Sequence, residues 1–218
     1  MNALRFMPAW RRGAAGLLLM LAGGCSALLP KPTPTAPPAH YSLDGAPAPM
    51  SAPRSGPSTR PAAAPTLLID APRAAAGFDS RRIVYTREPH RLEAFAHSEW
   101  VDTPARMLAP LIVAAVDDGG AFRVVVPATT AAAGDLRLDT EIVRLQHEFG
   151  GAPSRVRFTL RATLVDLTTR RVLAQREFDQ TAASASEDPP GGVTAANRAV
   201  RSVLDELAAF CAEATLNR

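Results

Sequence analysis

The strictest pattern in this chain of 218 residues is an alternation of apolar and polar side chains between Arg155 and Val165. Its apolar members are Val156, Phe158, Leu160, Ala162 and Leu164, and the positions between them carry arginine and threonine. Successive side chains of a strand point to opposite faces of the sheet. The pattern therefore predicts an antiparallel strand with one buried face and one solvated face.

The preceding segment predicts a second long strand with an irregularity in its middle. Leu136, Leu138 and Ile142 share one parity, whereas Val143, Leu145 and Phe149 share the other. A shift of one residue exchanges the two faces of a strand, so this switch predicts a β-bulge near Ile142–Val143. A turn over residues 167–170 then leads into a third strand over residues 171–181.

Shorter elements are predicted on either side of these strands. Apolar runs favour strands at 67–69, 82–86, 91–95 and 122–126. Helical spacing and a Thr-Pro start predict a helix from Pro104 to the glycines at 119–120. A second helix is expected to start at residues 189–192, and its apolar stripe ends at Cys211. The expected fold is α+β: one small domain over residues 66–218, with two main helices packed on a mostly antiparallel, mixed sheet.

A proline-rich tether is expected before this domain. Residues 30–65 hold 11 of the 20 prolines, and such a segment buries too little apolar surface to fold by itself. Fully extended, it would span on the order of 100 Å. Residues 40–44 interrupt it with Tyr41 and Leu43. This interruption predicts either a short strand that docks onto the domain or two incidental apolar residues in a linker.

The first 24 residues have the layout of a cleavable lipoprotein signal. Three arginines precede an uncharged apolar stretch, which ends in Gly24-Cys25. We expect cleavage between Gly24 and Cys25, with lipid attached to Cys25 at the start of the tether (residues 25–65). An uncleaved membrane helix over residues 13–29 is the main alternative, because no residue there is charged. Arg11-Arg12 also matches the arginine pair of a twin-arginine export signal, which is a further alternative.

The net charge of +3 comes from the signal. Without residues 1–24 the chain has 21 basic and 21 acidic residues, so its overall charge gives no reason to expect a nucleic acid partner. The covalent lipid on Cys25 is the only prosthetic group expected. Cys211 is then left without a partner in its chain, so we expect no disulfide and a buried, inert thiol.

No arrangement of catalytic residues stands out, so we do not expect an enzyme. His90, Glu93 and His97 would share a face of a helix and could bind a metal there. Residues 91–95 favour a strand instead, on which these side chains do not converge, so no metal site is expected. His147-Glu148 lies at a strand end without a third partner.

Charged residues of the long strands are expected to pair with one another. Arg137, Asp139 and Glu141 face the same way on their strand, with Arg157 and Arg161 on the next one, and this set favours cross-strand ion pairs over a substrate site.

Two aromatic residues are candidates for partner binding or for packing. Trp100 is either exposed for a partner or packed at the strand-to-helix corner, and its size favours packing. Tyr41 is the second such candidate.

Several stretches, in this order, resemble the ABC-type transport auxiliary lipoproteins. This family includes the small lipoprotein encoded with paraquat-inducible and mammalian-cell-entry (MCE) type lipid transporters. The stretches are Gly24–Ser26, Tyr41–Leu43, Arg82–Arg87, Leu92–Phe95, Glu99–Pro104, Asp135–Leu138, the Phe178 strand, and Asp188–Val193 leading into Ala195–Ala199.

The resemblance implies a non-enzymatic periplasmic component of a lipid transport system. Its partners would be an MCE protein and the ABC permease and ATPase of that system. Ser26, which follows the lipidated cysteine, favours the outer membrane by the sorting rule of such lipoproteins. Self-assembly into a homo-oligomer is left open. The alternative function is an envelope or cell-wall assembly lipoprotein that activates a synthase by contact.

Overall fold

The structure is a computed structural model that describes residues 37–44 and 63–216. The predicted signal, the predicted lipidation site Cys25, the alternative membrane helix and the twin-arginine pair lie outside these residues. No helix within the described part is both long and apolar enough to cross a membrane. The described residues fall into one compact unit, which begins at Pro37.

The centre of this unit is the antiparallel meander that the alternation predicts. It consists of β7 (Leu136–Glu148), β8 (Arg155–Asp166) and β9 (Arg171–Ala183). The predicted bulge is confirmed: Ile142 pairs with Leu160 and Arg144 with Thr159, so Val143 is the extra residue between them. After the bulge, the Leu145 side chain lies on the buried face of β7.

Short strands pair in parallel along the other edge of β7. They are β2 (Thr66–Ile69), β3 (Arg73–Ala74) and β4 (Arg82–Thr86). Further out, β6 (Val124–Pro127) pairs with β2, and β5 (Glu93–Trp100) pairs with β4. The last strand, β1 (Ala39–Tyr41), pairs with β5. The described strands thus form one mixed sheet of nine strands.

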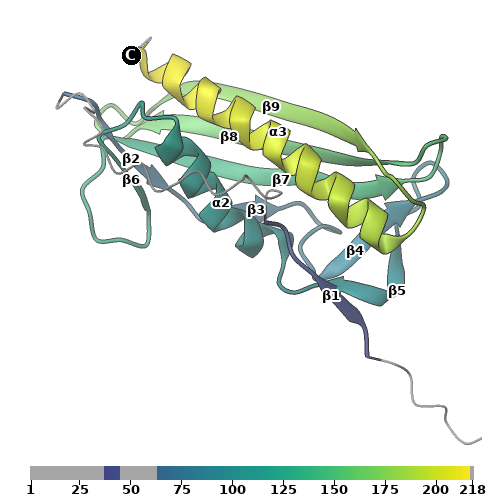
Figure 1. Cartoon of the computed structure of the whole chain (residues 1–218). Coiled ribbons are helices and arrows are strands. Elements are labelled where there is room, and N and C mark those ends of the chain that lie inside the picture. Colours follow the sequence, from purple (N-terminus) through teal and green to yellow (C-terminus); the bar gives the residue numbers. More distant parts are fainter. Residues whose placement is uncertain (1–36, 45–62, 217–218) are drawn as a thin grey trace, which may run out of the picture. The chain divides into compact units, whose positions relative to one another are not determined.

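Both main helices cover the same face of this sheet (Figure 1). Helix α3 (Pro189–Leu216) packs along β7, β8 and β9, and α2 (Pro104–Asp118) packs beside α3 and against β6. Apolar side chains from the helices and the sheet form one continuous core between the two layers. Its largest fully buried members include Phe122, Phe158, Phe178, Leu108, Ile112 and Leu207.

The predicted α+β class is confirmed, and the differences lie in the short elements. The strand expected at 91–95 runs over 93–100, because Ser98 and Trp100 continue the inward alternation after a turn at Pro89–His90. The strand expected at 122–126 begins two residues later, at Val124. β3 was missed, since two residues show no periodicity.

The face of the sheet opposite the helices, here called the open face, is polar. Arg161 bonds Glu141 on β7 and Glu177 on β9, at 2.9 Å each. Arg157 donates to both carboxylate oxygens of Asp179. The predicted cross-strand ion pairs therefore exist at Arg161 and Glu141, while Arg157 pairs with β9 instead of β7. Arg137 and Asp139 contact each other along the same strand at 3.3 Å.

Candidate functional site

The proline-rich tether meets the domain at the docked segment (residues 39–44). β1 lies parallel to β5 with Tyr41 opposite Trp100, and the amide of Val101 donates to the Tyr41 carbonyl at 2.8 Å. Leu43 is 5% exposed and belongs to the core. Of the two interpretations of this interruption, the docking strand is therefore confirmed.

Asn197 of α3 holds the end of the docked segment. Its Oδ1 accepts a hydrogen bond from the Asp44 amide at 2.9 Å, and its Nδ2 donates to the Ser42 carbonyl at 3.2 Å. The side chain is 7% exposed. A buried amide that bonds both edges of a backbone segment fixes that segment in position.

We expect Asn197→Ala to release the docked segment without unfolding the sheet. The change leaves the Asp44 amide and the Ser42 carbonyl without this partner, which costs about 1–3 kcal/mol. Hydrogen exchange at residues 41–44 should accelerate, while exchange in β8 should not change. The control is Thr194→Ala, one turn earlier on α3, where the exposed hydroxyl donates to the Pro190 carbonyl and does not contact the docked segment through any hydrogen bond between described residues. Unchanged exchange at residues 41–44 in the Asn197 variant would contradict this role.

Docking changes the expected length of the tether. Because residues 39–44 are part of the domain, only the chain before Ala39 can separate the domain from an anchor at Cys25. Those 14 residues (25–38) extend to about 40 Å at most in a polyproline conformation. The estimate on the order of 100 Å for residues 30–65 is therefore wrong.

The two aromatic candidates are packed rather than presented to a partner. Trp100 is 3% exposed, and its carbonyl accepts a hydrogen bond from Arg81 Nε at 3.0 Å. The packing alternative is thus the correct one for Trp100. Tyr41 is half-buried and packs against the core. Neither ring forms an exposed binding surface.

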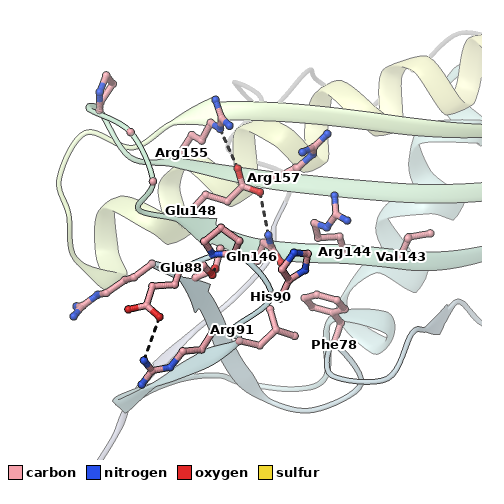
Figure 2. A pocket seen from close by; sticks show the side chains of 17 residues that line it. Phe78, Glu88, His90, Arg91, Val143, Arg144, Gln146, Glu148, Arg155 and Arg157 are labelled. Atoms are coloured by element: carbon pink, nitrogen blue, oxygen red, sulfur yellow. Dashed lines mark hydrogen bonds and ion pairs between the residues drawn. The ribbon is translucent and has the colours of Figure 1, made fainter.

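A cavity of about 680 Å³ with both charged and apolar lining residues, here called the arginine groove, lies on the open face at one end of the sheet (Figure 2). The end of β7, the start of β8 and the loop over residues 86–92 line it. Sequence reasoning missed this groove, because it gathers residues from segments far apart in the chain. Its charged residues are Arg87, Arg91, Arg144, Arg155, Arg157, Glu88 and Glu148.

Three of these arginines are paired with carboxylates. Arg155 Nε lies 3.0 Å from Glu148 Oε2, and Arg91 Nη1 lies 3.5 Å from Glu88 Oε2. Arg157 binds Asp179, and its hydrogen bonds lower the pKa of that carboxyl from 3.8 to about 2. These pairs hold their side chains in place along the groove.

Arg87 and Arg144 have no hydrogen bond or ion pair with any described residue. The Arg87 guanidinium lies over the rings of Tyr85 and Phe149, at 5.3 and 5.6 Å from their centroids. Arg144 follows the bulged Val143 on β7. Both side chains line the groove. Figure 2 shows Arg144 and His90 among the side chains that line it.

The three residues considered for a metal do not share a helix face. His90 lies in the loop with a positive φ of 66°, and Glu93 and His97 lie on β5. Glu93 accepts a hydrogen bond from the Tyr85 hydroxyl at 3.1 Å. Within the described residues, no cluster of three His, Cys, Asp or Glu side chains is placed to hold a metal ion.

His147 lies in the core, under the first turn of α3. It is 2% exposed, its Nε2 bonds Ser154 Oγ at 3.0 Å, and its ring stacks on Phe149. Its Nδ1 has no partner among the described residues. Burial lowers the pKa of His147 below its ordinary value of 6.5, although Asp188 and Glu187 oppose part of this effect.

We expect His147 to destabilise the fold in acid. The unfolded chain takes up a proton near pH 6.5 while the folded chain resists it, so stability is lost as the pH falls through 6.5 and is unaffected well above it. Between pH 7.5 and 5.5 the loss from this group should be about 1 kcal/mol. Urea unfolding at both pH values should show a smaller loss in His147→Gln than in the wild type. His97→Gln, at an exposed position on β5, should keep the wild-type loss. Equal pH slopes in both variants would refute this role.

Cys211 lies in the core on α3, fully buried as the stripe predicts. Burial raises the pKa of its thiol to about 12, so the reactive thiolate is scarce at neutral pH.

Comparison with known proteins identifies the family. The ABC-type transport auxiliary lipoprotein component family matches residues 41–208, from the docked segment into α3. No curated protein matches the chain. A crystal structure of a Xanthomonas campestris protein is 25% identical, with a TM-score of 0.66, and the alignment covers 74% of this chain and 91% of that one.

Two further solved structures share the fold. One is an uncharacterised protein, 12% identical with a TM-score of 0.61, covering 80% of this chain and 99% of its own. The other is a hypothetical protein from Chlamydia trachomatis, 10% identical with a TM-score of 0.51, covering 72% and 100%. With the matched region spanning most of the sequence, this chain belongs to the family of ABC-type transport auxiliary lipoprotein components.

Proposed function

We propose that this protein is an outer-membrane-anchored periplasmic lipoprotein that binds and positions the conduit of an MCE-type lipid transporter. The observation that carries the proposal is the family match, which includes both the docked segment and the sheet. In this function the protein carries out no catalysis. It keeps a folded domain close to a membrane while that domain contacts a partner.

The docked segment supports this function physically. A chain anchored at Cys25 is connected to the domain through Ala39 on β1, and Asn197 on α3 holds the other end of the docked segment at Ser42 and Asp44. The tether is therefore attached to the domain at a defined position, the edge of the sheet where β1 pairs with β5. Such an attachment limits how far the domain lies from the membrane.

The outer strand of the meander supplies a surface for contact. β9 pairs with β8 along 12 positions, and no other described strand pairs with it. Its outer edge therefore presents backbone amides and carbonyls that can pair with an extended segment of another chain. That segment belongs to the MCE partner in this proposal.

Co-purification tests the partner. The full-length lipoprotein should be recovered with the MCE protein encoded beside it after mild cross-linking in cells. A deletion strain should show increased permeability of the envelope. Absence of both effects would overturn the proposal.

Fractionation tests the anchor separately. Cys25→Ala should accumulate as an unprocessed precursor and leave the outer-membrane fraction, because the lipid can no longer be attached. Cys211→Ala changes the chain's other cysteine, which is buried in α3, and should fractionate like the wild type. A Cys25→Ala protein that remains in the outer membrane would show that another element holds it there.

A further inference from the structure

We propose that the arginine groove is a binding site for a phosphate-bearing anion of about the size of a phospholipid headgroup. Arg87 and Arg144, which form no hydrogen bond or ion pair with a described residue, line this cavity from the loop after β4 and from β7. The site goes beyond the proposed function, which requires a protein contact only.

The groove concentrates positive charge in a chain that is otherwise balanced. Its lining contains five arginines and two glutamates, whereas residues 25–218 carry equal numbers of basic and acidic groups. A concave surface lined by one sign of charge raises the local concentration of ions of the opposite sign. The charge is therefore arranged to attract an anion to this end of the open face.

Arg87 is held ready for a ligand. Its guanidinium lies above Tyr85 and Phe149, and those two rings are themselves in edge contact at 5.7 Å. An arginine stacked on aromatic rings keeps its donors free at its rim. Binding through a side chain that is already ordered loses less conformational entropy.

Arg144 is placed by the bulge. Without Val143 as an extra residue, the regular alternation of β7 would put position 144 on the same face as Ile142, which is buried in the core. The bulge reverses this alternation, and Arg144 lines the groove instead. Bulges commonly redirect a side chain next to a functional site.

The loop opposite β7 is held in an uncommon conformation. His90 has a φ of 66°, a region that residues other than glycine rarely occupy. The Thr86 hydroxyl donates to the Glu88 carbonyl at 2.7 Å and so fixes the start of this turn. Backbone strain of this kind tends to occur at binding sites, where surrounding contacts maintain it.

The chemistry of the lining favours phosphate. A guanidinium donates two parallel hydrogen bonds to neighbouring oxygens of a phosphate, and a phosphate has enough oxygens to accept from several arginines. The Glu148 carboxylate already accepts from Arg155 and Gln146 and so leaves the donors of Arg87 and Arg144 available. The lining also contains apolar side chains such as Phe78, Leu92 and Val143, but its five arginines make the headgroup the part of a lipid that the groove is suited to bind.

The test uses the full mature chain with Cys25→Ser, which lacks the lipid and stays in solution. Three probes separate the sources of phosphate: inorganic phosphate, glycerol 3-phosphate, and phosphatidylcholine vesicles with or without phosphatidylglycerol. Calorimetry reports on the two soluble probes and sedimentation on the vesicles. We expect binding to at least one phosphate probe, weakened about tenfold or more in Arg87→Gln/Arg144→Gln.

The control removes the same charge elsewhere. Arg106 on α2 and Arg171 at the start of β9 are exposed and lie outside the groove. Arg106→Gln/Arg171→Gln should bind all probes within about twofold of the parent chain, because only screened long-range attraction is lost. Circular dichroism and thermal unfolding should show that both double variants are folded.

Each outcome decides the proposal. Binding to vesicles only when phosphatidylglycerol is present assigns the ligand to a lipid headgroup, and binding to the soluble probes alone assigns it to free phosphate esters. Failure to bind any probe, equal loss in both double variants, or tighter binding of a polyglutamate peptide would overturn it. The last result would indicate an acidic protein segment instead. None of these results affects co-purification with the MCE protein, which is measured separately.

Discussion

Phe158→Ala is expected to lower the free energy of unfolding by about 3–5 kcal/mol. Phe158 is fully buried on β8, the middle strand of the meander, where it pairs with Leu145 on one side and Gln180 on the other. Helix α3 packs directly over this strand. Removing the ring leaves a cavity between two layers that are fixed by continuous backbone pairing, so the site cannot collapse to fill it.

Urea denaturation followed by circular dichroism measures this loss. Val172→Ala is the matched control, because Val172 lies on the neighbouring strand β9 but is 60% exposed. Its effect should stay within about 0.5 kcal/mol. A loss below about 1.5 kcal/mol for Phe158→Ala would mean that the core is less tightly packed than the structure indicates.

Gly191→Ala is expected to destabilise the protein by about 1–3 kcal/mol. This sign is opposite to the usual one, because alanine in place of glycine inside a helix normally stabilises by about 1 kcal/mol. A Cβ at position 191 would lie 2.3 Å from Ser186 Oγ and 2.5 Å from the Ser186 carbonyl oxygen. The carbonyl belongs to the backbone, so the clash cannot be relieved by a change of rotamer.

The first turn of α3 explains why this backbone cannot move freely. Asp188 Oδ1 accepts hydrogen bonds from the Gly191 amide at 2.9 Å and from Ser186 Oγ at 2.6 Å. These bonds, led by the one from Ser186, lower the pKa of the Asp188 carboxyl. Relieving the clash would break this cap at the start of the helix.

Thermal unfolding of Gly191→Ala and Gly150→Ala separates the clash from general effects of alanine. A Cβ at position 150 would meet no atom within 4 Å, so that variant should unfold at nearly the wild-type temperature. A Gly191→Ala protein as stable as the wild type would show that the Ser186 turn adapts.

The long strands could be predicted from the sequence because their signal is local. Alternate residues of β8 form its buried face, so the strand can be recognised from its own sequence. The switch of parity in β7 likewise locates the bulge without knowledge of which strand pairs with β7. β4 follows the predicted bounds of 82–86 for the same reason. Wherever one buried face repeats over several residues, the pattern alone identifies the strand.

The docked segment and the arginine groove were harder to predict because each joins segments that are distant in the sequence. The bond between Asp44 and Asn197 connects residues 153 positions apart, and no periodicity indicates it. The arginine groove brings Arg87 to Arg144 across the parallel pairing of β4 with β7. Arginines that alternate along a strand predict a solvated face, but their neighbours across the sheet decide which of them stay unpaired.

The docked segment divides the proline-rich region into two parts with different roles. Residues 45–62 connect two points on the same domain, Asp44 and Ala63, so their length has no effect on how far the domain would reach from an anchor at Cys25. With that anchor, residues 25–38 alone would set the distance. For a domain confined within about 40 Å of a membrane attachment point, the effective concentration of a partner at that point is on the order of 10 mM. A tether of about 100 Å would give a value roughly tenfold lower. With the shorter tether, even a contact with millimolar affinity would be largely occupied, so a small and polar interface would suffice.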